Sequence, residues 1–106
     1  MSVNVTTYLM LGCKFKYDEI PQHIIDGAIE DNCYLDRGLK IRLIPKSCYE
    51  DSDLFIGSIL GELEEYSDDM VEINKVFSNY ADIQLAIEKK LHIERTVSLF
   101  MFHQWS

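Results

Sequence analysis

The stretch VNVTTYLMLGCKF, residues 3–15, alternates between two sets of side chains along most of its length. The odd positions from Val3 to Leu11 hold only Val, Thr or Leu, whereas Asn, Thr, Tyr and Met stand between them. A period of two with many β-branched and aromatic residues is typical of a strand. The stretch therefore predicts a β-strand.

A helix is predicted directly after this strand. Asp18 can cap it, and Pro21 is tolerated in a first turn, where backbone N–H groups lack partners within the helix. The segment should stop being helical by residues 31–32. Its apolar residues recur at helical spacing and predict one buried face, made of Ile20, Ile24, Ile25, Ala28 and Ile29.

Two strands are predicted in the middle of the chain. A turn at Asp36-Arg37-Gly38 precedes the first, residues 39–44, which Pro45 ends. A polar loop over residues 46–53 leads into the second, residues 54–63. Gly57 and Gly61 predict a bulge or a close approach of two backbones in that strand.

The last third of the chain is only partly decided by its pattern. Residues 64–78 fit a short strand, a helix face or a loop, because their apolar residues match both periods. From residue 79 a helix is predicted, with Ile83, Ala86, Ile87 and Leu91 on its apolar face. Residues 94–103 then predict a strand, whose almost continuous apolar run indicates a central place in the sheet.

The predicted order is strand, helix, strand, strand, helix, strand. This order predicts one α+β domain over residues 1–106, with two helices on one face of an antiparallel sheet. It matches the βαββαβ order of ferredoxin-like folds. A further strand within residues 64–78 would change that topology.

The acidic residues are concentrated in one part of the chain, which we call the acidic window, between Lys46 and Lys75. It contains no Lys or Arg but nine of the 18 acidic residues, so it carries −9, and the rest carries +1 towards the net charge of −8. A local field of this kind either keeps a domain soluble or attracts a basic partner that would otherwise bind nucleic acid.

The interaction hypothesis makes this window a partner-binding surface for a basic protein site. Tyrosine rings beside carboxylates supply contact area, while the charges set specificity and association rate. The alternative for the tyrosines is packing on the core with the hydroxyl in water. The candidate residues are Tyr49, Glu50, Asp51, Asp53, Glu62, Glu64, Glu65, Tyr66, Asp68, Asp69 and Glu72.

Other classes of function find little support in the sequence. A pI near 4.7 argues against direct binding to DNA or RNA phosphates. The three cysteines form no Cys-x-x-Cys pair, and no glycine-rich phosphate loop is present. We assign no catalytic residue, no metal ligand and no cofactor, and we expect a cytoplasmic protein without a membrane span. A homodimer formed through the sheet is a further expectation.

Two segments carry a resemblance to a known group of proteins. Thr6-Thr7-Tyr8-Leu9-Met10-Leu11-Gly12-Cys13-Lys14-Phe15 and Leu54-Phe55-Ile56-Gly57-Ser58-Ile59-Leu60 resemble small acidic bacteriophage-encoded proteins of undefined activity. Such proteins often bind and block host machinery, including restriction and CRISPR effectors.

The resemblance implies an inhibitor in the cytoplasm of a host cell. Such an inhibitor would act as a nucleic-acid mimic, an anti-CRISPR protein being one form, by occupying a basic nucleic-acid-binding site of a host defence complex. The alternative is a small-ligand-binding or regulatory α+β domain.

Overall fold

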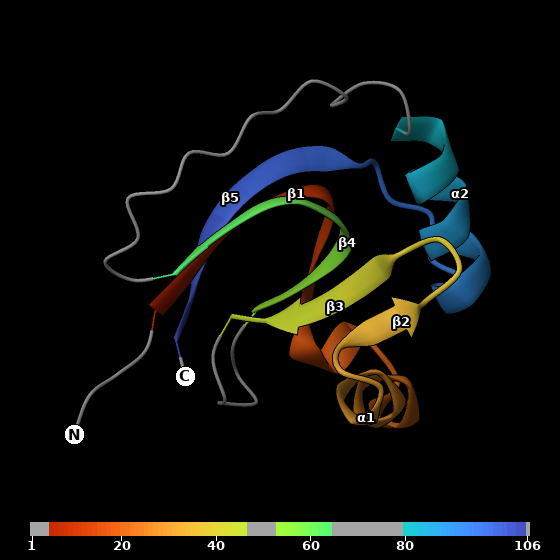
Figure 1. The fold of residues 1–106 in the computed structure, drawn as a ribbon. Coiled ribbons are helices and arrows are strands. Elements are labelled where there is room, and N and C mark those ends of the chain that lie inside the picture. The colour runs from red at the N-terminus through yellow and green to blue at the C-terminus, as the bar shows by residue number, and fades with distance from the viewer. Residues whose placement is uncertain (1–4, 47–52, 65–79, 106) are drawn as a thin grey trace.

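The computed structural model describes residues 5–46, 53–64 and 80–105 (Figure 1). It has an α+β fold, as the sequence predicts, with five strands in one antiparallel sheet and two α-helices. In chain order the elements are β1 (Val5–Lys16), α1 (Gln22–Glu30), β2 (Tyr34–Asp36), β3 (Ile41–Pro45), β4 (Asp53–Glu64), α2 (Tyr80–Leu91) and β5 (Ser98–Trp105).

The strands lie in the order β2-β3-β4-β1-β5. The four-stranded ferredoxin-like order is not confirmed, because β2 adds a fifth strand that the sequence pattern does not predict. The prediction that the last strand is central is wrong, since β5 lies at an edge of the sheet. Residues 65–78, whose pattern fits more than one structure, lie outside the described residues.

Both helices pack against the same face of the sheet, which we call the outer face. Ile25 and Ala28 of α1 and four apolar residues of α2 are buried there against alternate residues of β1, β3 and β4. Burying an aliphatic side chain of this size contributes about 1.5–3 kcal/mol, so this layer is the main source of stability. The sheet residues of the layer are Leu11, Cys13, Phe15, Ile41, Leu43, Leu54 and Ile56.

The opposite, inner face holds a second, aromatic cluster. Phe55 of β4 stacks on Phe102 of β5, with ring centroids 3.8 Å apart, although β1 lies between these two strands. The Gln104 side chain, near the end of β5, donates a hydrogen bond to the Pro45 carbonyl oxygen at the end of β3 over 3.1 Å. The sheet is therefore strongly curled, with its inner face closed over the aromatic rings, and Figure 1 shows β5, β1, β4 and β3 bending around this side.

Two glycines permit this curl. Gly12 of β1 pairs with Gly57 of β4. A Cβ atom on Gly12 would lie 2.2 Å from the Ile56 carbonyl oxygen, and one on Gly57 would lie 2.3 Å from that of Leu11. The close approach predicted for Gly57 is confirmed. The predicted bulge is also present, because the β1–β4 register shifts between Leu9, which pairs with Gly61, and Met10.

The start of α1 differs from the prediction. Residues Tyr17–Glu19 form a separate 3-10 turn, and α1 begins at Gln22 with Pro21 as its N-cap, so Asp18 does not cap it. Pro21 ends the first turn because its ring fixes φ and it has no N–H to donate. Ile29, predicted on the buried face, is 47% exposed.

The chain leaves α1 through two consecutive residues with positive φ, Asn32 at 54° and Cys33 at 65°. This left-handed pair reverses the chain and brings Tyr34 opposite Arg42, which creates β2. Left-handed backbone is rare for a residue such as Cys, and no glycine marks the position in the sequence.

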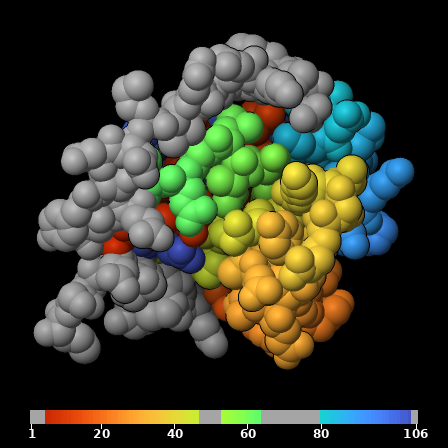
Figure 2. Space-filling model, in the orientation of Figure 1, coloured from red at the N-terminus to blue at the C-terminus, as the bar shows by residue number. Residues whose placement is uncertain are grey.

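On the face shown in Figure 2, β4 lies beside β3, with α1 and β2 below.

Candidate functional site

Two acidic side chains of the acidic window are described, one near each end of β4. Asp53 is the first residue of β4 and pairs with Lys16 of β1, whereas Glu62 lies near the other end of β4 and pairs with Tyr8. Nine steps along a strand have a path length of roughly 30 Å, and β4 bends strongly with the sheet (Figure 1). Within the described residues, the acids of the window therefore lie near the two ends of β4.

The other candidate residues of the window are Glu64 and eight residues that flank β4 in the sequence. Glu64 is the last residue of β4. The remaining candidates, Tyr49, Glu50, Asp51, Glu65, Tyr66, Asp68, Asp69 and Glu72, lie outside the described residues.

Glu62 is exposed and belongs to the inner face beside Tyr8. The pKa of Tyr8 is raised, first by burial and then by the negative charge of Glu62. The Tyr8 hydroxyl donates a hydrogen bond to the Gln104 side chain over 3.3 Å. The ring is thus part of the core, while the exposed Glu62 carboxylate next to it lies within hydrogen-bonding reach of the Tyr8 hydroxyl.

The ion pairs among the described residues leave Asp53 and Glu62 uncompensated. They join Arg37 to Asp31 and Arg95 to Glu19, and all four of these residues lie outside the window. Neither window carboxylate therefore forms an ion pair within this part of the chain, although Lys16 lies opposite Asp53 and Arg42 acts on the same Tyr8 hydroxyl as Glu62.

Two arginine side chains lie beside Tyr34 at the β2 edge of the sheet. The guanidinium groups of Arg37 and Arg42 lie 4.7 and 4.9 Å from the centroid of the Tyr34 ring. Within the described residues the Arg42 Nε is buried without a hydrogen-bond partner, and an Arg42 terminal nitrogen lies 3.5 Å from the Asn32 carbonyl oxygen. Arg37 is paired with Asp31, and the Arg42 charge lowers the pKa of Tyr8 that Glu62 raises, so Arg42 and Glu62 both lie near the Tyr8 hydroxyl.

The free edge of β5 is a surface that the sequence analysis missed. Leu99 is 51% and Met101 74% exposed. Both lie on the outer face, since they pair with Leu11 and Leu9. The apolar run that suggested a central strand therefore has one buried side, with Phe100 and Phe102, and one exposed apolar side. An uncharged run beginning at Thr96 is the signal that could have identified it.

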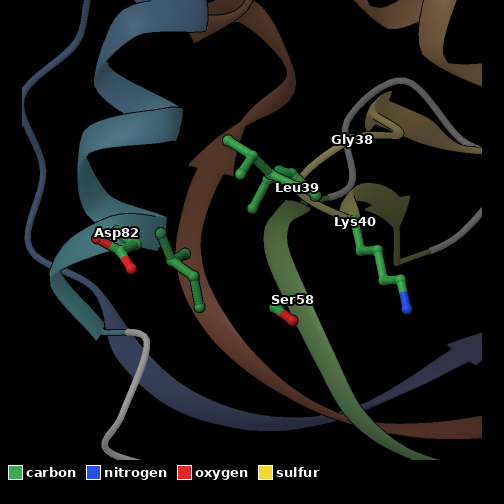
Figure 3. Close-up of a pocket in the computed structure, with 7 residues that line it drawn as sticks. Gly38, Leu39, Lys40, Ser58 and Asp82 are labelled. Carbon is green, nitrogen blue, oxygen red and sulfur yellow. The ribbon is translucent and has the colours of Figure 1, made fainter.

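A small pocket opens between α2, β4 and the connection from β2 to β3. It has a volume of about 240 Å³ and is lined by Gly38, Leu39, Lys40, Ile41, Ser58, Asp82 and Ile83. Figure 3 shows Asp82 and Lys40 on opposite sides, with Ser58 between them and the Lys40 amine pointing away from Asp82. These three polar groups could orient a small polar ligand, although ligand sites more often have about 300–1,000 Å³.

The chemistry of Cys13 is that of a core thiol. It is 1% exposed, and burial raises its pKa to about 11. Its Sγ lies 3.6 Å from the Thr96 carbonyl oxygen. The thiolate needed for nucleophilic attack is therefore disfavoured at neutral pH.

The described residues hold neither a cluster of metal-ligating side chains nor a helix that could span a membrane. Among them, no three His, Cys, Asp or Glu side chains come together in a way that would hold a metal ion. Neither of the two described helices has the length and apolar character needed to cross a bilayer.

Comparison of the chain with models of protein families, with curated proteins and with solved structures found no match in any of the three.

Proposed function

We propose that this chain is a non-enzymatic binding protein whose acidic window engages a basic site on another protein. The observation that carries the proposal is the charge separation, with −9 in the window and +1 in the rest of the chain. The exposure of Glu62 and the absence of ion pairs to Asp53 and Glu62 within the described residues support it. Acidic surfaces of this kind steer basic partners and compete with nucleic acid for them.

In its most concrete form, the proposal is a phage-type inhibitor that occupies the nucleic-acid-binding site of a host defence complex such as a CRISPR effector. The sequence resemblance to small acidic phage proteins supports this form. Carboxylates on an extended strand would meet Arg and Lys side chains that otherwise contact phosphates. Asp53 and Glu62, near the two ends of β4, would then contact different parts of the basic site.

The test is competition with DNA for a purified CRISPR effector complex. The variant reverses five acids at the Glu62 end of the window to Lys, which changes the net charge from −8 to +2. We expect the wild-type protein to displace a labelled DNA target and the variant to lose at least tenfold in potency, while its far-ultraviolet circular dichroism remains that of the wild-type protein. The reversed residues are Glu62, Glu64, Glu65, Asp68 and Asp69.

The matched control reverses five acids outside the window and reaches the same net charge of +2. Asp36 is left unchanged because its carboxylate accepts a hydrogen bond from the Leu39 N–H in the turn before β3. Equal loss in both variants, or no displacement by the wild-type protein, would contradict the proposal. The control residues are Asp18, Asp26, Glu30, Glu88 and Glu94.

A second reversal separates the two ends of β4. Replacing Glu50, Asp51 and Asp53 with Lys changes only the Asp53 end of the window. If the partner has an elongated groove, this variant also loses potency. If it retains the wild-type potency, the contact is confined to the Glu62 end.

The second candidate function is binding of a small polar ligand, and the pocket beside Ser58 and Asp82 favours it. It ranks below the first because a volume of about 240 Å³ lies under the usual range for ligand sites.

We also infer a ferredoxin-like ancestry for the sheet. When β2 is set aside, β4 lies between β3 and β1, and β1 lies between β4 and β5. Each helix then connects two strands that have a third strand between them, which is the arrangement of split βαβ units. On this inference β2 is an addition at the edge of the sheet.

A further inference from the structure

β5 is an edge strand without the usual protection. It pairs with β1 over eight consecutive positions with no shift in register, and the described residues place no strand on its other side. Edge strands are commonly protected by short length, a bulge, Pro or a charged side chain. β2, at the opposite edge, has only three residues, a register shift and an aspartate. β5 has eight residues, and none is Pro, Lys, Arg, Asp or Glu.

The side chains along this edge are also exposed and apolar. Leu99 and Met101 lie on the outer face beyond the helical layer, since α2 packs mainly on β1, β3 and β4. Neighbouring large apolar side chains on the surface of a protein indicate an interaction site. Among the described residues, the edge thus has backbone groups without a strand partner and an apolar strip beside them.

We propose that the occupant of this edge is β5 of a second copy of the chain. The two strands would run antiparallel about a two-fold axis at Phe100 and join two five-stranded sheets into one. In this register Leu99 lies opposite Met101 of the second copy, and Met101 opposite its Leu99. Opposed residues of antiparallel strands share a face, so all four exposed side chains meet on the outer side.

The absence of charge along β5 permits a second copy there and gives a basic foreign strand nothing to recognise. Each copy carries −8, so two copies repel each other wherever their acids face one another. Along β5 no like charges would be opposed, because residues 96–106 contain no Lys, Arg, Asp or Glu. A basic foreign strand would find no carboxylate on β5 to select it.

The register follows from the exposed side chains. A two-fold axis at Met101 would place Leu99 opposite His103, which would leave an apolar residue against a polar one. The axis at Phe100 instead places the exposed Leu99 opposite Met101 on the outer face and brings the two Phe100 rings together on the inner face.

The first test is the mass in solution, measured by light scattering. We expect the wild-type protein at twice its chain mass of 12.4 kDa, and Met101→Lys at 12.4 kDa, because a lysine on an edge blocks strand pairing. Met101 is 74% exposed, so the substitution should leave the fold intact. The control is Leu85→Lys on α2, where the side chain is 55% exposed, and it should remain a dimer. A monomeric wild-type protein, or a monomeric Leu85→Lys, would overturn the proposal.

The second test fixes the register by cysteine cross-linking. Under a mild oxidant, Leu99→Cys/Met101→Cys should form a covalent dimer, while each single variant should give no more than the wild-type background from Cys13, Cys33 and Cys48. If the double variant forms no covalent dimer, pairing with a second copy is rejected. This is also the result expected if the edge instead accepts a strand of another protein. Cross-linking of Met101→Cys alone would reject the axis at Phe100. This inference is independent of the proposed function, since Met101→Lys keeps every acid of the window and can still be assayed against the effector complex.

Discussion

At the scale of single residues, the pairing of Gly12 with Gly57 controls the curvature of the sheet. Each α-carbon faces the backbone of the neighbouring strand at a distance that a side chain cannot occupy. The reason is steric, because neither glycine has positive φ. The curl that brings Phe55 against Phe102 therefore depends on two positions without a Cβ atom.

Replacing either glycine with alanine should destabilise the protein. The added Cβ would lie 2.2 or 2.3 Å from a backbone oxygen, so the strands must separate locally. Forced overpacking of this kind costs about 1–3 kcal/mol, and urea unfolding followed by circular dichroism would measure it. Near-ultraviolet circular dichroism should report the loosened packing of Tyr8, Phe55 and Phe102.

Gly27 supplies the matched control for this prediction. It lies in α1, and a Cβ atom there would have nothing within 4 Å. Gly27→Ala should therefore stabilise the protein by about 0.5–1 kcal/mol through helix propensity. If Gly12→Ala and Gly57→Ala were as harmless as Gly27→Ala, the steric account of the curl would be wrong.

At the scale of elements, Arg95 links three segments that are distant in sequence. Its guanidinium lies 4.4 Å from the centroid of the Phe15 ring, donates to the Lys14 carbonyl oxygen of β1 and pairs with Glu19 of the 3-10 turn. Arg95 precedes β5, so these contacts hold the entry to β5 against the end of β1.

The link to Glu19 should make stability depend on acidity. The hydrogen bond from Arg95, assisted by that from the Lys16 backbone N–H, lowers the pKa of Glu19 below its ordinary value of 4.5. A carboxylate whose pKa is lower in the folded state contributes stability above its unfolded pKa, and that contribution is lost as pH falls through the folded pKa. Glu19→Gln should therefore be less stable than the wild-type protein at pH 7, and the difference should shrink steadily below about pH 4.5.

Thermal unfolding at a series of pH values checks this prediction. Glu30→Gln is the control, because Glu30 is exposed on α1 and takes no part in the ion pairs of the described residues. It should follow the wild-type pH profile. A difference between Glu19→Gln and the wild-type protein that does not change with pH would show that the carboxylate charge is not what stabilises the link.

At the scale of the whole molecule, charge and shape oppose each other. A net charge of −8 keeps copies apart, whereas the uncharged β5 edge draws them together. The same charge attracts a basic partner. The two proposed interactions should therefore respond to salt in opposite directions.

Raising the ionic strength should tighten the homodimer and weaken binding to a basic partner. Salt screens the repulsion between two acidic copies, and it equally screens the attraction to a cationic groove. Sedimentation velocity across a salt series measures the first effect, and DNA competition on the effector complex measures the second. Parallel salt dependence of the two would mean that one of them does not involve the acidic charge.

The sequence by itself determined the local structure of this protein. The alternation in β1, the helical spacing of Ile83, Ala86 and Ile87 in α2, and the stop at Pro45 are set by side chains close together in the chain, because backbone period and steric limits are local. The α+β class follows from the order of these elements. The concentration of acid between Lys46 and Lys75 is likewise a property of the sequence alone.

Tertiary structure decided which residues meet. The edge position of β5 depends on pairing with β1, from which it is separated by most of the chain, and no local pattern records that choice. The left-handed turn at Asn32 and Cys33 contains no glycine that would have predicted it from the sequence. This turn brings Tyr34 opposite Arg42 and so forms β2. Asp53 and Glu62 both belong to the acidic window, but they lie near opposite ends of β4. The number of acids in a stretch of sequence does not say where their side chains lie in the folded strand.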